Sequence, residues 1–156
     1  MKILIGYPPT ESQKGVPLLS QNRQFQWFSN PSYIYPVILG SAATLLKNKS
    51  HEVIWTDCIA EKISWKGFIK IIEKESPNLF VFETKTPVIK KHWEIINNLK
   101  EKFPDMNIAI MGDHVTAFPK ETMENSKVDF VLCGGDFDFI LGDLIDYLNK
   151  DIKKIP

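Results

Sequence analysis

The chain has 156 residues, of which 44% are hydrophobic and 24% charged, and its 19 lysine and arginine residues balance 19 aspartate and glutamate residues. This composition is typical of one globular domain and excludes a disordered, collagen-like or disulfide-based chain. Because the net charge is zero, no global basic field exists, and neither nucleic acid nor a membrane is an expected partner.

We expect no targeting segment in this chain. No apolar run approaches the roughly 20 residues that a membrane-spanning helix needs, and the apolar start at residues 1–6 is too short for a signal peptide. Cys58 and Cys133 lie far apart and form no CxxC unit, so we expect buried or free thiols. These features predict a cytoplasmic protein.

Five short apolar runs predict five strands. They are Ile3–Tyr7, Val53–Thr56, Leu79–Phe82, Ile108–Met111 and Val128–Cys133. Each run is continuous rather than alternating, which is typical of strands that are covered on both faces.

Helical patterns separate and follow these runs. They cover residues 34–48, 64–75, 88–103, 117–126 and 137–149, with Ser64 as an N-cap and Pro119 in a first turn. A strand followed by a helix, five times over, predicts crossover connections and a parallel sheet. We therefore predict an α/β, flavodoxin-like (Rossmann-type) three-layer sandwich with strand order 2-1-3-4-5 over residues 1–150, and a tail or start of a linker at 151–156.

One connection is unusually long. Residues 8–33 separate the first predicted strand from its helix, whereas such loops usually have about 2–6 residues. The segment contains several prolines and the aromatic residues Phe25, Trp27 and Phe28. A long loop at the carboxyl edge of a parallel sheet usually serves a ligand or a partner, while the alternative is a surface loop whose aromatic rings pack back on the domain.

Ligands of open α/β sheets bind beyond the carboxyl ends of the strands. The turns there offer small and polar residues at 8–10, 57–58, 83–87, 112–116 and 134–136. Neither GxGxxG nor GxxxxGK[ST] is present, and the first turn reads Gly6-Tyr7-Pro8-Pro9 instead of paired acids. This argues against a standard dinucleotide site, a P-loop and a phosphorelay receiver.

The three histidines do not indicate a metal site, because no cysteine or carboxylate ligands are spaced around them. We expect His51 to be structural and His92 to lie on a solvated helix face. His114, after the fourth predicted strand, lies at the ligand edge and is a candidate for ligand contact.

An ordered set of segments runs through nearly the whole chain. It comprises residues 2–9, Pro36 to Leu46, His51-Glu52-Val53 with Asp57, Pro77-Asn78-Leu79, residues 111–117 with Pro119, Glu121 and Thr122, Val128 to Val131, and Gly134-Gly135. This set resembles the cobalamin-binding domain that precedes the catalytic barrel in many radical S-adenosylmethionine enzymes, such as methyltransferases and cyclases.

The resemblance implies a corrinoid held against the carboxyl edge of the sheet, with its nucleotide tail inserted beside the third and fourth strands. The implied cofactor-binding residues are Pro8, Pro9, Thr10, Thr84, Lys85, Thr86, Gly112, Asp113, His114, Val115, Gly134 and Gly135. Gly112 would leave room for the tail, so leucine at this position is expected to abolish corrinoid uptake and leave the fold intact.

The chain departs from related patterns at three places. Cobalamin-dependent mutases carry Asp-x-His-x-x-Gly after the first strand, whereas residues 8–12 here hold no histidine, so a corrinoid would bind without a histidine from this loop. Asp113 would repel a tail phosphate unless Lys85 or another cation compensates it. With two cysteines, the chain cannot supply a CxxxCxxC run, so the iron–sulfur cluster and S-adenosylmethionine would belong to a barrel partner, in cis or in trans.

Two alternatives stay open. One is a non-catalytic interaction module on the same fold, with a degenerate cofactor edge and the aromatic cluster Phe25, Trp27 and Phe28 as partner surface. The other is a small enzyme that uses Asp113 and His114 as an acid–base pair.

Overall fold

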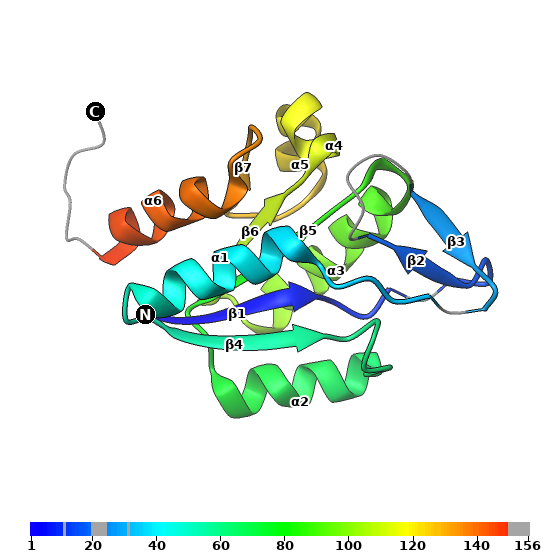
Figure 1. The fold of residues 1–156 in the computed structure, drawn as a ribbon, viewed down its shortest axis with the longest axis horizontal. Coiled ribbons are helices and arrows are strands. Elements are labelled where there is room, and N and C mark those ends of the chain that lie inside the picture. Colours follow the sequence, from blue (N-terminus) through cyan, green and yellow to red (C-terminus); the bar gives the residue numbers. More distant parts are fainter. Residues whose placement is uncertain (11, 20–24, 31, 150–156) are drawn as a thin grey trace.

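The computed structural model (Figure 1) describes residues 1–10, 12–19, 25–30 and 32–149, and the tail or linker expected at 151–156 lies outside them. Its main sheet has five parallel strands, which are β1 (Lys2–Tyr7), β4 (Glu52–Asp57), β5 (Leu79–Glu83), β6 (Asn107–Met111) and β7 (Phe130–Leu132). Their order is β4-β1-β5-β6-β7. This is the predicted flavodoxin-like order.

Helices cover both faces of this sheet. They are α1 (Val37–Asn48), α2 (Trp65–Glu75), η1 (Thr86–Val88), α3 (Ile89–Lys102), α4 (Asp113–Ala117), α5 (Pro119–Asn125) and α6 (Phe137–Asn149). The core separates into two clusters, one under α2 and α3 and one under α1 and α6. In β1, Leu4 enters the first cluster while Ile3 and Ile5 enter the second, because successive strand side chains point to opposite faces.

Helix boundaries follow local chemistry. The Ser64 Oγ accepts a hydrogen bond from the Gly67 N–H, which confirms the predicted N-cap of α2. α1 begins at Val37 rather than at residue 34, because Pro36 restricts the residue before it and caps the helix instead. The helix expected at 117–126 is the separate helix α5, preceded by α4, and Pro119 opens α5 as predicted.

The segment between β1 and α1 contains an antiparallel hairpin, β2 (Val16–Leu18) with β3 (Gln26–Phe28), that the sequence did not predict. In Figure 1 this hairpin lies beyond the tip of β1, at the carboxyl edge of the main sheet. Phe25 and Trp27 are partly buried against the α1–α6 cluster and contact each other edge to face. Both rings therefore pack partly back on the domain, which is the alternative that the sequence left open for this loop, and a partner surface at these residues stays untested.

Candidate functional site

The strand ends at the carboxyl edge form a network of buried polar side chains. Tyr7 ends β1 and donates its hydroxyl to Glu83 Oε2, at 2.9 Å, and Glu83 ends the neighbouring strand β5. Lys85 Nζ lies 3.2 Å from Glu83 Oε1 and 3.3 Å from Asp113 Oδ2. Tyr7, Glu83 and Lys85 are almost fully buried, whereas the Asp113 side chain is 69% exposed. Lys85 therefore joins the ends of β5 and β6.

Burial determines the protonation behaviour of this network. It raises the pKa of Glu83, and the positive charge of Lys85 acts against that rise. The pKa of Tyr7 is raised, first by burial and then by the charge of Glu83. Tyr7 thus stays a hydrogen-bond donor. Lys85 does compensate Asp113, but it shares its charge with Glu83, so the three ionised side chains would together be negative.

His92 lies at the centre of a second polar group under the same edge. Its Nδ1 is 2.8 Å from the Thr84 Oγ1 and its Nε2 is 3.2 Å from the Thr10 Oγ1. The residue is fully buried, and burial lowers its pKa to about 3. The prediction of a solvated His92 is wrong, because α3 turns this residue toward the sheet, where its ring contacts Phe82.

The space beside Gly112 is filled by the protein itself. Gly112 has φ +126°, and a Cβ at this position would collide with the carbonyl oxygen of Thr84. The Thr84 N–H donates to the Met111 carbonyl at 2.8 Å, which holds the two chain segments together. The glycine is therefore required by close backbone approach. The direction in which a side chain would leave Gly112 is thus occupied by the Thr84 carbonyl.

Asp113 and His114 face different partners. Asp113 pairs with Lys85, whereas His114 Nδ1 lies 3.1 Å from the Thr86 Oγ1 and His114 Nε2 lies 3.3 Å from a Glu121 carboxylate oxygen. The His114 side chain is 5% exposed. The two side chains do not face a common substrate position, so the structure does not support them as an acid–base pair.

The last turn of the edge is open. Gly134 and Gly135 are exposed, and a Cβ at Gly135 would meet no atom within 4 Å. Thr116 holds this turn, since its Oγ1 accepts a hydrogen bond from the Gly134 N–H at 3.1 Å. Among the predicted cofactor residues, Thr86, Asp113, Gly134 and Gly135 are exposed, whereas Thr84, Lys85 and Val115 are buried.

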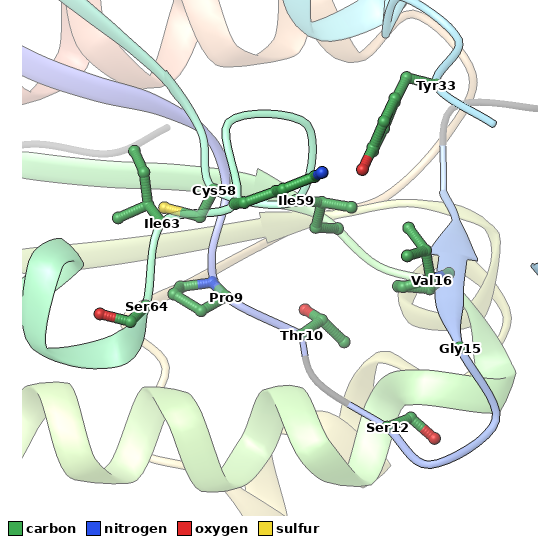
Figure 2. Close-up of a pocket in the computed structure, with 12 residues that line it drawn as sticks. Pro9, Thr10, Ser12, Gly15, Val16, Tyr33, Cys58, Ile59, Ile63 and Ser64 are labelled. Atoms are coloured by element: carbon green, nitrogen blue, oxygen red, sulfur yellow. The ribbon is translucent and has the colours of Figure 1, made fainter. Parts of the chain in front are cut away.

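A cavity of about 410 Å³ lies on the other side of the edge (Figure 2). It is framed by Pro9 and Thr10 after β1, by Val16 of the hairpin, by Tyr33, and by the loop that follows β4. Pro9 and Thr10 were predicted site residues, and the other lining residues were not. No sequence motif marks this cavity, because it is formed by the hairpin standing apart from the β4–α2 loop.

Within residues 1–10, 12–19, 25–30 and 32–149, no three histidine, cysteine, aspartate or glutamate side chains gather in a way that could hold a metal ion. Over the same residues, no helix has the length and apolar character needed to cross a bilayer. Cys58 is buried and Cys133 is exposed, and both are free thiols.

The chain is similar in sequence to part of a longer protein. No known family profile matches the sequence. The chain is 25% identical over 150 residues to an uncharacterized methyltransferase of Pyrococcus horikoshii, and the match covers 96% of this chain but 30% of that protein. The chain therefore spans less than a third of the length of this curated relative.

Among solved structures, the fold is similar to a CheY-like protein, tadZ, of Pseudomonas aeruginosa. The TM-score is 0.57 at 10% sequence identity, and the match covers 100% of this chain and 99% of that chain. At this identity the likeness establishes the flavodoxin-like fold alone.

Proposed function

We propose that this chain is the cobalamin-binding module of a multidomain methyltransferase, and that a corrinoid lies on the carboxyl edge of its sheet. The observation that carries the proposal is the alignment with a methyltransferase over 150 residues, which make up 30% of that protein. Since this chain has no catalytic constellation among its described residues, methyl transfer would need a further part of such an enzyme.

The edge supports a corrinoid at its surface rather than a deeply inserted one. Gly134 and Gly135 follow β7 and offer an exposed backbone with free space. Pro8, Pro9 and Thr10 follow β1 at the same edge, with β5 and β6 between the two turns. These residues would hold the macrocycle and its amide side chains by contact and hydrogen bonding. When bound, the corrinoid would supply a cobalt that accepts and donates a methyl group.

We expect the nucleotide tail to lie elsewhere than directly beside Gly112, the place that the sequence resemblance implies. Thr84 and His92 are hydrogen-bonded to each other in the interior. The Thr84 carbonyl occupies the position that a Cβ would take at Gly112. A tail would have to stay outside the β5–β6 turns or displace them. The radical step would take place in a partner, a radical S-adenosylmethionine barrel. That barrel would hold the iron–sulfur cluster, because the two cysteines of this chain are too few to ligate it.

The test is retention of hydroxocobalamin. Purified protein is mixed with excess hydroxocobalamin, desalted, and the corrin absorbance per chain is measured. We expect close to one corrinoid per chain for the natural sequence. Gly135→Phe should lower retention at least about fivefold, because the new ring fills the free space at the edge.

Lys74→Phe is the matched control, since it adds the same ring to an 82% exposed position at the far end of α2. It should retain the corrinoid fully. A colourless natural protein after desalting would contradict the proposal, as would equal loss of colour in both variants.

A further inference from the structure

The described residues that line the cavity beside the hairpin are mostly apolar and include a single charged side chain, that of Lys62. Its wall carries Pro9, Val16, Ile59 and Ile63, and the Tyr33 ring closes one side. Figure 2 shows the Tyr33 hydroxyl directed toward Ile59 and the middle of the cavity. A volume of about 410 Å³ lies within the range of about 300–1,000 Å³ that is usual for small-molecule sites.

Lys62 is the charged residue of this wall. It has φ +53°, a left-handed conformation that costs a non-glycine residue about 1 kcal/mol or more. No carboxylate of the described residues lies within ion-pair distance of its Nζ, although 12 ion pairs occur elsewhere in that part of the chain. Its ammonium group is thus available for an anion.

The wall that carries Lys62 is held rigidly. Asp57 Oδ1 accepts hydrogen bonds from the N–H groups of Ile59 and Ala60, at 3.1 and 3.0 Å. The Ile63 N–H donates to the Cys58 carbonyl at 3.0 Å, which closes the loop before α2. A wall fixed in this way loses little conformational entropy when a ligand binds.

The hairpin wall is fixed as well. The Gly15 N–H donates to the Ser12 carbonyl at 3.1 Å, and a Cβ at Gly15 would collide with the carbonyl of Phe28. These two contacts fix the turn before β2 and its close approach to β3.

We propose that this cavity binds a small planar aromatic or heteroaromatic anion, with its ring between Tyr33 and the aliphatic side chains and its anionic group at Lys62. Aliphatic and aromatic walls favour a flat ring, and a lysine without a carboxylate partner favours one negative charge. The inference goes beyond cobalamin binding and does not depend on it.

The test is an NMR titration with naphthalene-2-sulfonate and, as its uncharged counterpart, naphthalene-2-sulfonamide. We expect saturable shifts of the amide signals of residues 59–63 and 15–16, and about tenfold weaker binding of the sulfonamide. Lys62→Met should weaken sulfonate binding about tenfold and leave sulfonamide binding unchanged. Lys66→Met, which removes an exposed lysine outside the cavity, is the matched control and should change neither.

The same titration with hydroxocobalamin present separates the two proposals. Binding of the sulfonate with or without retained corrinoid supports this inference, whatever the outcome for cobalamin. Absence of saturable binding, shifts confined to other parts of the chain, or equal effects of Lys62→Met and Lys66→Met would overturn it.

Discussion

The two halves of the carboxyl edge differ in how their polar groups are used. Around β5 and β6, the groups satisfy each other, through the Glu83–Lys85–Asp113 ion pairs and the hydrogen bonds of Thr84 with His92 and Met111. Around β1 and β4, the hairpin stands apart from the β4–α2 loop and leaves a cavity. Lys62 in its wall has no ion-pair partner among the described residues. Polar residues at a ligand edge are therefore not sufficient evidence of a ligand, because space must also be left.

We call the half of the edge around β5 and β6 the closed half, and the half around β1 and β4 the open half. The largest expected effect is a loss of stability in the closed half. Gly112→Leu places a side chain against the Thr84 carbonyl at a φ of +126°, which should destabilise the protein by several kcal/mol, on the order of 4. This expected loss runs against the expectation from sequence that the variant keeps its fold. Chemical denaturation measures the loss, and Gly135→Leu, at an open position, should change the free energy of unfolding by less than about 0.5 kcal/mol.

A smaller effect concerns the buried ion pair. Lys85→Met leaves the Glu83 carboxylate buried without its cation, which should cost about 3 kcal/mol at neutral pH. The double variant Lys85→Met with Glu83→Leu should recover much of that loss, since it leaves neither charge buried. An additive loss in the double variant would show that the pair is not what stabilises this half.

His92 makes the closed half sensitive to acid. Its pKa is about 3 in the folded protein and about 6.5 when unfolded, so the unfolded state binds a proton first. Its contribution to stability is complete above pH 6.5 and is lost as the pH falls, by on the order of 2 kcal/mol at pH 4.5. The measurement is urea unfolding of the natural protein and of His92→Gln from pH 7 to pH 4.5.

Only the difference between the two proteins in how their free energy of unfolding changes with pH reports on His92. Glu83 has a raised pKa, so its titration favours the folded state as the pH falls and acts in the opposite sense. Identical slopes of stability against pH in both proteins would contradict the assignment to His92.

The smallest expected effect lies in the open half. Lys62→Gly relieves a left-handed lysine and should change the free energy of unfolding by less than about 1 kcal/mol in the stabilising direction. Thermal unfolding would detect this as a rise of a few degrees, on the order of 2–4 °C. A clear loss of stability would show that the lysine has a structural role that its described contacts do not reveal.

The fold was predictable because its signals are local. Continuous apolar runs at Ile3–Tyr7 and Leu79–Phe82 identified buried strands, and Ser64 identified the start of α2. β7 is shorter than the predicted Val128–Cys133, since the three residues Phe130–Leu132 pair with β6. Pairing with a neighbour decides the ends of such a strand, and that information is not local.

The burial of two polar groups could have been predicted from the sequence. Ile89, His92, Ile96 and Leu99 are three or four residues apart, and this spacing places His92 on the buried face of α3. Tyr7 and Glu83 are the last residues of neighbouring strands, so topology alone brings them to one place. The cavity, in contrast, depends on contacts between segments about 40 residues apart and could not be predicted from local patterns.

The unequal environments of the two cysteines provide a selective chemical handle. Cys58 is buried, and burial raises the pKa of its thiol, whereas Cys133 is exposed beside the Gly134–Gly135 turn. A maleimide fluorophore should therefore attach at position 133 while the chain stays folded. One labelled position next to the open turn would report the arrival of a chromophoric ligand by quenching, without any substitution in the protein.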